Sequence, residues 1–392
     1  MSRTQVGIVG AGPAGLLLSH LLHLRGIDSV VIDNRPRASI ETTIRAGVLE
    51  QATVDLMHQI GVGARLAREG FIHHGFEMRF SGRGHRIDLA ALTNGKSITV
   101  YPQHEVLTDL IAARLATGGD LRFGVTDTAV HDLEGHAPRI CFTDADGIAR
   151  ELTCDIIAGC DGFHGVCRDA IPEGARSEYH RVYPFGWFGI LAEAPPSSDE
   201  LIYARHDRGF ALISTRSPTL QRMYFQCPPD ERPEKWSEAR IWDELHARTA
   251  GAGFRLKDGP IVQRGVIAMR SFVCEPMRFG RLLLAGDAAH VVPPTGAKGL
   301  NLAAADAFVL ARALGAFFAD GSAVLLDDYS ATALRRVWRV QHFSWWMTSM
   351  LHRFDGAGAF DERRQLAELE LVTGTEAGAR LLAETYVGQP FG

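Results

Sequence analysis

The stretch QVGIVGAGPAG, residues 5–15, has the residue types and spacing of a loop that binds phosphate groups. An apolar run enters the loop, and an apolar run of helix-forming residues follows it. Gly10 permits a tight turn, Gly12 lets the backbone approach a pyrophosphate, and Gly15 lets the helix pack closely on the strand. The helix N-terminus then offers free N–H groups to phosphate oxygens. The stretch predicts a nucleotide such as NAD or FAD, and the alternative is a plain turn between a strand and a helix.

Three further features extend this prediction to a long dinucleotide. Asp33 ends a second apolar run, so its carboxylate can accept hydrogen bonds from ribose hydroxyls. Residues 151–162 predict another strand, which leads to Asp161. Residues 281–290 predict a further strand with Asp287, followed by a glycine-containing loop that opens a helix. Three separated elements of this kind favour FAD over NAD, which is the shorter ligand.

The composition argues against several other classes of protein. The 392 residues are 46% apolar and 22% charged, which is ordinary for a soluble globular protein. The net charge of −5 gives no general attraction to nucleic acid or to anionic membranes. Six cysteines form no C-x-x-C pair and no zinc-like spacing, so we expect reduced thiols, a cytoplasmic location and no metal site. The longest apolar stretch, residues 299–319, contains Asn301, Asp306 and Arg312, which favours a buried helix over a membrane span.

Several blocks of the sequence resemble the single-component flavin-dependent aromatic hydroxylases. The fingerprints of that family are matched by GAGPAG, CDG and GDAAHVVPPTGAKGLN. Further matching blocks are RAGVLEQ (45–51), RIDL (86–89), AGCDGFHG (158–165), RVYPFGW (181–187), PPTGAKGLNLAA (293–304) and FSWWMTS (343–349). The resemblance runs from residue 4 to about residue 389. It implies tightly but non-covalently bound FAD, NADH or NADPH as hydride donor, O2 as co-substrate and a phenolic acid as substrate.

The resemblance also implies an α/β fold of mixed α+β type in three parts. Residues 1–180, completed by residues of about 268–300, would form a Rossmann-like FAD-binding domain. Residues 181–267 would form a mixed-sheet substrate domain, and their alternating β-prone stretches GFALIST and RMYFQC favour this independently. Residues 301–392 would form a helical C-terminal region, whose aromatic residues we expect to pack in the core or between two subunits of a homodimer. These aromatic residues are Trp338, Phe343, Trp345 and Trp346.

The FAD contacts that the resemblance implies extend beyond the residues already named. They come from several parts of the chain and include the loop that precedes the apolar stretch 299–319. The full predicted set is Gly10, Gly12, Gly15, Asp33, Arg45, Gln103, Asp161, Arg222, Asp287, Lys298, Gly299, Leu300 and Asn301. Lys298 would add positive charge near the pyrimidine end of the flavin, which favours the reduced anion.

A carboxylate in a desolvated pocket needs a fixed cation, and the planar fork of arginine suits it. In a strand, Ser214 and Arg216 would share one face, as would Arg222 and Tyr224. From residue types alone, this segment could equally be a solvated edge strand. The resemblance implies that Arg216 pairs with the substrate carboxylate and that Ser214 and Tyr224 donate hydrogen bonds to it.

The hydroxyl end of the substrate needs help to lose its proton. Hydroxylation is an electrophilic attack on the ring, and phenolate is a far better electron donor than phenol, whose pKa is about 10. The resemblance implies a proton relay from Tyr203 to Tyr386 and then to His73, with Pro294 beside the flavin and the substrate hydroxyl. Histidine suits the outer end because it exchanges protons near neutral pH. His74 is the alternative to His73 at that position.

The donor site departs from the pattern of relatives that prefer NADPH. Those relatives place arginine where this chain has Asn34 and Thr43, so two cations for a 2′-phosphate are missing. Arg35 and Arg37 are possible replacements, but we expect NADH to be usable. The residues that the resemblance implies for the nicotinamide donor are Arg35, Arg45, His164 and Arg270.

Three functions remain open at this level. The presence of a complete residue set favours 4-hydroxybenzoate as substrate, because one part would bind a carboxylate and the other a hydroxyl para to it. The set is Tyr203, Ser214, Arg216, Tyr224 and Tyr386. The same chemistry on 3-hydroxybenzoate or salicylate is an alternative. A non-enzymatic binding protein that reuses the fold is a third, and it would be purified colourless and unable to take up FAD.

Overall fold

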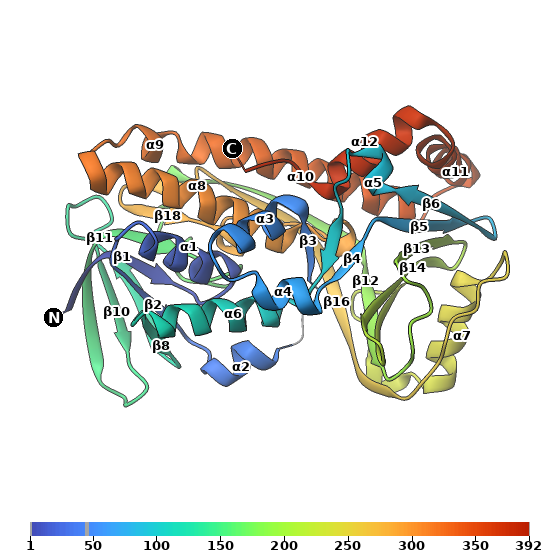
Figure 1. Cartoon of the computed structure of the whole chain (residues 1–392), viewed down its shortest axis with the longest axis horizontal. Helices are drawn as coiled ribbons and strands as arrows, with labels where there is room; N and C mark the ends of the chain where they lie inside the picture. The colour runs from blue at the N-terminus through green and yellow to red at the C-terminus, as the bar shows by residue number, and fades with distance from the viewer. Residues whose placement is uncertain (1, 44–46, 392) are drawn as a thin grey trace.

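The computed structural model describes residues 2–43 and 47–391. The glycine-rich loop leaves β1 at the centre of the first sheet, where β1 pairs in parallel with both β2 and β11 (Figure 1). Along its main path the order of the first sheet is β17-β18-β11-β1-β2-β8, and β10 and β9 extend it beside β11. Its strands are β1 (Ser2–Val9), β2 (Ser29–Asp33), β8 (Asp120–Phe123), β9 (Thr126–His131), β10 (Arg139–Thr143), β11 (Ala149–Gly159), β17 (Arg278–Phe279) and β18 (Leu282–Leu284). The strand predicted at residues 29–33 is confirmed with those bounds.

Two apolar helices beside this sheet begin next to glycine loops. Helix α1 (Pro13–His23) follows the first loop, and α8 (Gly299–Asp320) follows the loop after β18. The two helices pack against each other (Figure 1). By length and composition, α8 is the one helix in the described residues that could cross a membrane, but 56% of its apolar window is buried. The helix predicted over residues 299–319 is therefore confirmed as a largely buried element.

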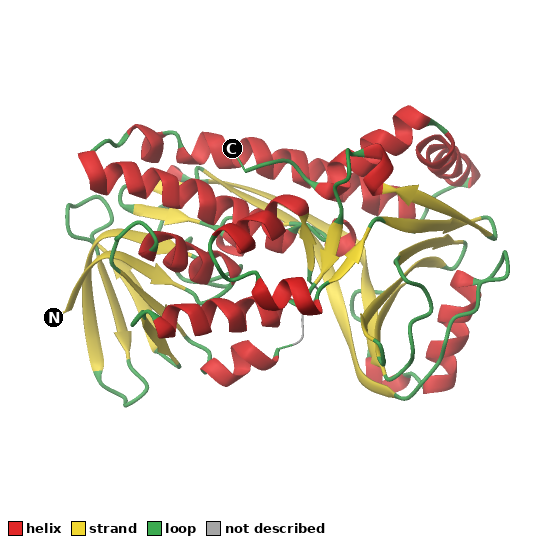
Figure 2. Cartoon of the chain, viewed as in Figure 1, coloured by secondary structure: helices red, strands yellow, loops and turns green. Residues whose placement is uncertain are grey.

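The second sheet carries the segments that the sequence predicted to be strands around residues 209–227. Its order is β19-β16-β12-β15-β14-β13-β5-β6, mostly antiparallel (Figure 2). Its strands are β5 (Gly75–Phe80), β6 (Arg83–Asp88), β12 (Ser177–Ala192), β13 (Leu201–His206), β14 (Gly209–Ser217), β15 (Leu220–Cys227), β16 (Ile261–Glu275) and β19 (His290–Val291). A third sheet has three strands in the order β3 (Val48–Glu50), β7 (Ile98–Val100) and β4 (Phe71–His73).

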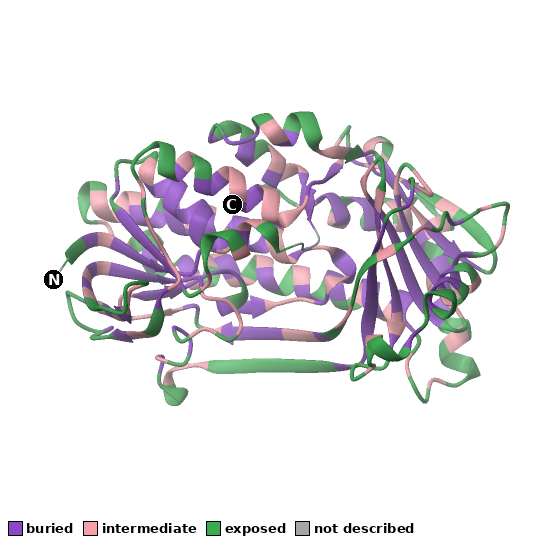
Figure 3. Ribbon diagram, turned by 90° about the horizontal axis from the view of Figure 1, so that it is seen from below, coloured by how far each residue is buried: buried purple, intermediate pink, exposed green. Residues whose placement is uncertain are grey.

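The two faces of the second sheet pack against different helices. Ile202, Ala211 and Met223 face a core that includes side chains of α7 (Glu238–Thr249). The alternate positions Tyr203 and Leu212 face a core shared with the C-terminal helices. Those helices are α10 (Tyr329–Leu351), α11 (Ala359–Gly374) and α12 (Glu376–Val387). Figure 3 shows how far the strands are buried between these layers.

The remaining helices complete the outer layers. They are α2 (Arg37–Thr42), α3 (Gln51–Gln59), α4 (Ala64–Glu69), α5 (Leu89–Leu92), α6 (Gln103–Ala116) and α9 (Val324–Asp327). The overall prediction of a Rossmann-like part, a mixed-sheet part and a helical C-terminal part is confirmed.

Chain order does not follow the sheets strictly. Strands β5 and β6 belong to the second sheet because β13 pairs in parallel with β5, although they lie within the segment 1–180. The residue limits of the three domains stay a prediction. Those limits assign residues 75–88 to the FAD-binding domain, whereas β5 and β6 pair within the second sheet.

Candidate functional site

A cavity of about 520 Å³ opens where the two glycine loops meet. Its lining joins the ends of β1, β2 and β11 with the N-termini of α1 and α8. Two helix N-termini offer N–H groups and positive dipole ends to the same space, as phosphate groups require. Of the predicted FAD contacts, the lining includes Gly10, Gly12, Asp33, Gln103, Asp161, Asp287, Gly299 and Leu300.

The glycines of the first loop are needed for two different reasons. Gly10 has a φ of +108°, and a Cβ there would lie 2.2 Å from the carbonyl oxygen of Cys160. A Cβ at Gly15 would lie 1.9 Å from the carbonyl oxygen of Gly10, so the helix could not pack where it does. A Cβ at Gly12 would meet no atom within 4 Å, which leaves this backbone open to a ligand in the cavity.

Asp161 has unused hydrogen-bonding capacity in the cavity wall. Its Oδ2 accepts the backbone N–H of Cys167 at 2.9 Å, and its buried Oδ1 has no partner among the described residues. Burial raises the pKa of this carboxyl group. A buried acceptor without a donor is costly, and a hydroxyl group of a bound ligand would satisfy it. The cavity, its open glycine backbone and this acceptor together fit a dinucleotide with a polyhydroxylated chain, as FAD has.

Asp33 lies where the sequence predicted it but already accepts four hydrogen bonds. Its Oδ2 accepts from the backbone N–H of Ala11 at 2.7 Å and from Nη2 of Arg35 at 2.9 Å. Its Oδ1 accepts from the backbone N–H of Arg35 at 2.8 Å and from Nε of the same residue at 3.0 Å. A ribose hydroxyl therefore has to compete with the Arg35 guanidinium for this carboxylate.

Lys298 and Asn301 make contacts that their predicted cofactor roles did not anticipate. The buried Lys298 Nζ donates to Glu50 Oε1 at 2.5 Å and to the carbonyl oxygen of Tyr386 at 2.8 Å. Burial lowers the pKa of Lys298, while Glu50 opposes that effect. The positive charge of Lys298 is thus balanced by a buried carboxylate. The Asn301 side chain accepts from the Glu50 backbone N–H and donates to the Val48 carbonyl oxygen, so it works as a structural clamp.

The substrate-binding candidates gather on one side of the second sheet. Tyr203 is paired with Leu212 and Leu212 with Tyr224, while Ser214 is paired with Arg222. Directly paired residues point to the same face of a sheet, and so do residues two apart in a strand, so all five side chains share one face. The regular alternation predicted for Arg216 is interrupted, because the pairing of β14 with β15 shifts between Thr215 and Ser217. A bulge of this kind re-aims a side chain.

Two polar side-chain atoms near this bulge have no hydrogen-bond partner among the described residues. The hydroxyl of Ser214, which is 2% exposed, and Nη1 of Arg216 are buried without a hydrogen-bond partner in the described part of the chain. Burial lowers the pKa of Arg216, and Arg222 adds to that effect while Tyr224 opposes it. The Tyr224 hydroxyl accepts from Arg222 Nε at 3.1 Å. A buried cation beside a free hydroxyl is an arrangement that an anionic group completes.

Tyr203 and Tyr386 are brought into direct contact across 183 positions of sequence. Their hydroxyl oxygens lie 2.5 Å apart, and each residue is 1% exposed. Burial raises the pKa of Tyr203 to about 12, whereas the hydrogen bond from Tyr386 opposes that rise. The pair therefore stays protonated at neutral pH and can pass a proton along a shared hydrogen bond. This contact joins β13 to α12.

His73 is buried and His74 is exposed, which separates the two candidates for the outer end of the relay. His73 Nδ1 accepts the backbone N–H of Leu201 at 3.3 Å, and its buried Nε2 has no partner among residues 2–43 and 47–391. Burial lowers the pKa of His73 to about 4, and nearby Arg216 contributes in the same direction. The charged form of His73 is therefore disfavoured near neutral pH, because a buried imidazole resists becoming charged.

The donor candidates fall into two places. Arg35 is held by Asp33, while His164 and Arg270 both contact Phe163, which lines the cavity. Arg45 is also predicted for both FAD and the donor, but it lies outside the described residues. Pro294 is half-buried at the start of the single turn that precedes α8.

Two polar pairs escaped the sequence analysis. One is Glu50 with Lys298, and the other is Trp187 with His352, whose Nε1 and Nε2 atoms are 2.7 Å apart. Glu50 and Trp187 both lie inside blocks that carry the resemblance, and that was the available signal. Among the described residues, no group of three or more His, Cys, Asp and Glu side chains could hold a metal ion.

Comparison with known proteins decides the family. The model of a family described as FAD binding domain matches residues 3–344. The p-hydroxybenzoate hydroxylase of Acinetobacter baylyi is 47% identical over 390 residues, which are 99% of this chain and 96% of that protein. The chain belongs to the FAD-dependent aromatic hydroxylases.

More distant relatives agree with this assignment. The anhydrotetracycline monooxygenase of Streptomyces rimosus is 29% identical over 360 residues, covering 84% of this chain and 66% of that protein. The crystal structure of p-nitrophenol 4-monooxygenase from Pseudomonas putida has a TM-score of 0.82 at 19% identity and covers 99% of this chain and all of that one. At that identity, the likeness shows the fold alone. FAD is thus the cofactor of this hydroxylase, as the cavity suggested.

The Asp33–Arg35 pair yields a test of how this hydroxylase accepts FAD. Replacing Arg35 by alanine removes the two guanidinium hydrogen bonds that compete with the ribose for Asp33, while the two backbone hydrogen bonds remain, so the FAD dissociation constant should fall about fivefold, equivalent to roughly 1 kcal/mol for a partly exposed ion pair. Arg37→Ala is the matched control, because Arg37 pairs with Glu41 on its own helix and, among the described residues, not with Asp33. Titration of deflavinated protein with FAD measures both. Weaker FAD binding in Arg35→Ala would mean that Arg35 contacts the cofactor directly.

Proposed function

We propose that the protein hydroxylates 4-hydroxybenzoate ortho to its phenol, with O2 and NADH or NADPH, to give 3,4-dihydroxybenzoate. The observation that carries this proposal is the pairing of two polar sites on one sheet face. The Ser214 hydroxyl and Arg216 Nη1, which have no hydrogen-bond partner among the described residues, lie at one, and the Tyr203–Tyr386 hydrogen bond lies at the other. The 47% identity to a p-hydroxybenzoate hydroxylase supports the same substrate.

The carboxylate of the substrate would complete the buried polar cluster at the bulge. Arg216 would supply the positive charge, and the Ser214 hydroxyl would donate a hydrogen bond. Tyr224 would donate its hydroxyl proton while it keeps accepting from Arg222. Charge-assisted hydrogen bonds in a desolvated site are strong enough to hold the ring in one orientation.

The phenol would lie against Tyr203. The Tyr203 hydroxyl can accept the phenol's hydrogen bond and donate to Tyr386, so the proton can leave in two short steps. When bound, FAD would supply the redox chemistry by which NAD(P)H and O2 give one oxygen atom to the ring and the other to water. The role of the tyrosine pair is to make the ring electron-rich when that oxygen is available.

We infer that His73 passes protons as a neutral imidazole. Its pKa of about 4 leaves it uncharged at neutral pH, and Nδ1 accepts the Leu201 backbone N–H, so Nε2 would carry the proton that is exchanged. Pro294 would border the flavin and the substrate hydroxyl from the turn before α8. Lys298 would act near the flavin as one half of a buried ion pair with Glu50.

A hydroxylase of 3-hydroxybenzoate or salicylate is the second candidate. It would need the same anchor for the carboxylate, so the unpartnered atoms of Ser214 and Arg216 do not separate the candidates. The buried Tyr203–Tyr386 pair favours 4-hydroxybenzoate, because only a hydroxyl para to the carboxylate lies directly across the ring from the anchor.

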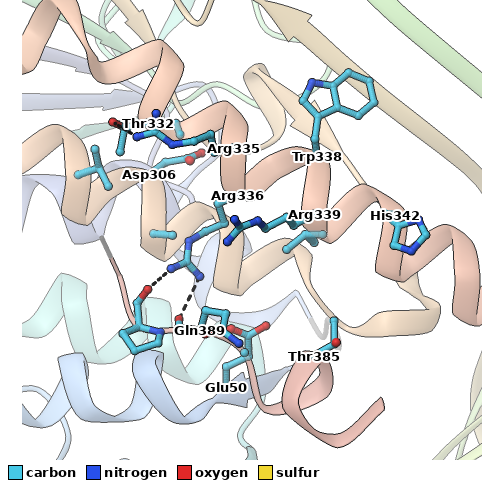
Figure 4. A pocket seen from close by; sticks show the side chains of 16 residues that line it. Glu50, Asp306, Thr332, Arg335, Arg336, Trp338, Arg339, His342, Thr385 and Gln389 are labelled. Atoms are coloured by element: carbon cyan, nitrogen blue, oxygen red, sulfur yellow. Dashed lines mark hydrogen bonds between the residues drawn. The ribbon is translucent and has the colours of Figure 1, made fainter. Parts of the chain in front are cut away.

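We further propose that the protein works as a cytoplasmic homodimer. Tyr179, Trp338 and Trp345 are between 39% and 48% exposed, and the Tyr179 and Trp338 rings touch at a centroid distance of 5.4 Å. Figure 4 shows Trp338 on α10 with Arg339 and His342, beside a cavity of about 890 Å³. Exposed aromatic clusters of this kind are typical of subunit interfaces. A mass in solution equal to one 42.8 kDa chain would contradict the dimer.

The proposed relay predicts that loss of the Tyr203 hydroxyl stops hydroxylation of the substrate but not oxidation of NAD(P)H. Tyr203→Phe keeps the ring but removes the hydroxyl, so the substrate should bind at Arg216 but stay protonated. NAD(P)H oxidation should continue with little 3,4-dihydroxybenzoate and nearly stoichiometric H2O2, whereas the unchanged enzyme should form one product per NAD(P)H. Oxygen-electrode and chromatographic assays measure the ratio. His73→Asn should be milder, because water can partly carry the proton.

Two outcomes would contradict this proposal at different points. Tight coupling in Tyr203→Phe would exclude Tyr203 as the proton acceptor and leave the activity itself standing. No aromatic product from the unchanged, FAD-loaded enzyme with 4-hydroxybenzoate would remove the proposed function.

The expected choice between NADH and NADPH follows from the ion pairs that Arg35 and Arg37 form. Arg35 is paired with Asp33 and Arg37 with Glu41, so neither possible replacement is available for a 2′-phosphate. NADH should therefore support turnover at least comparably to NADPH. Steady-state kinetics with both donors test this, and a kcat/KM that favours NADPH more than about tenfold, roughly 1.4 kcal/mol, would contradict it.

A further inference from the structure

His352, directly after α10, has a fully defined hydrogen-bonding state although it is 0% exposed. Its Nδ1 lies 3.0 Å from the carbonyl oxygen of Thr348, which can only accept, so Nδ1 carries the proton. Its Nε2 is therefore the acceptor for the indole N–H of Trp187, at 2.7 Å. Burial lowers the pKa of His352 to about 3, which keeps Nε2 available as an acceptor at neutral pH.

Trp187 connects this histidine with the proposed carboxylate site. Its ring lies nearly coplanar with that of His352, with an interplanar angle of 6°, and stacks on Phe210 with an angle of 21°. Its ring centroid lies 5.0 Å from that of Tyr224. Tyr224 is confined on another side by Gly189, where an added Cβ would lie 2.7 Å from the Tyr224 ring. The ring of Tyr224 thus has little space to move while Trp187 stays in place.

Thr348, which accepts from His352, also links the end of α10 to the turn before α8. The Thr348 hydroxyl lies 2.9 Å from that of Thr295, which is 0% exposed in the turn that also contains Pro294. The end of α10 therefore contacts both the wall beside Tyr224 and the turn before α8.

We propose that His352 is a positioning residue for the substrate carboxylate: it fixes Trp187, and Trp187 fixes the Tyr224 ring beside Arg216. This inference rests on the proposed function, since it assumes that a carboxylate binds there. Without the acceptor at position 352, the buried Trp187 N–H has no partner. A buried, unpaired N–H group is costly, so the indole would turn and release Tyr224.

The test compares two ligands that differ only at the end near Tyr224. 4-Hydroxybenzoate has the carboxylate, and 4-hydroxybenzamide has a neutral group of the same shape. His352→Phe keeps a flat ring for stacking but removes the acceptor. We expect the dissociation constant for 4-hydroxybenzoate to rise about tenfold in the FAD-loaded variant, about 1.4 kcal/mol. We expect less than a threefold change for the amide, measured by the change in flavin absorbance on binding.

Three further variants separate positioning from general damage. His352→Gln should stay within threefold of the unchanged enzyme, because its amide oxygen can accept from Trp187. In Trp187→Phe there is no indole N–H to strand, so adding His352→Phe to it should cost less than threefold. His131→Phe, at an exposed histidine on β9 of the first sheet, is the matched control and should change neither ligand.

Several results would overturn the inference. These are unchanged 4-hydroxybenzoate affinity in His352→Phe, equal weakening of both ligands, or costs that simply add in the double variant. If His352→Phe does not load FAD, Trp187→Phe alone decides, and it should weaken 4-hydroxybenzoate selectively. Arg216→Ala in the same assay keeps the two proposals apart. If it binds 4-hydroxybenzoate normally, the proposed anchor fails; if it weakens binding and His352→Phe does not, only the role of His352 fails.

Discussion

The register of β13, β14 and β15 is the constraint on which the proposed substrate site depends. Tyr203 pairs with Leu212 and Leu212 with Tyr224, so side chains from three strands reach the same face. A slip of one residue would turn each of them toward α7. The opposite face is filled by Ile202, Met223 and their neighbours, and this apolar packing makes such a slip costly. Hydrophobic alternation thus specifies where the polar groups lie.

Buried polar contacts then join this face to the rest of the molecule. Tyr386 reaches Tyr203 from α12, and its carbonyl oxygen accepts from Lys298 at the start of α8. Glu50 balances the charge of Lys298, and Asn301 holds the backbone of Glu50. The start of α8 and the Tyr203–Tyr386 pair therefore share one network. Removing a single member would leave buried charges or donors unpaired, so these groups act as a unit.

The parts of the fold that could be predicted from the sequence are those with local causes. The glycine loop and the strand that ends at Asp33 follow from residue type and apolar runs. The bulge at Arg216 could not be predicted, because it depends on how β14 meets β15. The parallel pairing of β13 with β5 joins segments more than a hundred residues apart, and no local pattern encodes it.

The site shows the same division. Tyr203 and Tyr386 could be paired only through a family resemblance, since 183 positions separate them. The ion pair of Asp33 with Arg35 and the depressed pKa of His73 depend on burial, which the sequence does not state. The balance of the Lys298 charge by Glu50 likewise needed the tertiary structure.

In the proposed site, the spacing of polar groups on one sheet face matches the distance from a carboxylate to a para hydroxyl. The most direct measurement is turnover of 2-, 3- and 4-hydroxybenzoate by the FAD-loaded protein, with products identified by chromatography. All three isomers carry the carboxylate that Arg216 would bind, and only the position of the hydroxyl differs. We expect 3,4-dihydroxybenzoate from the 4-hydroxy isomer and NAD(P)H oxidation with little or no aromatic product from the others. Coupled hydroxylation of the 2- or 3-hydroxy isomer at a comparable kcat/KM would contradict it.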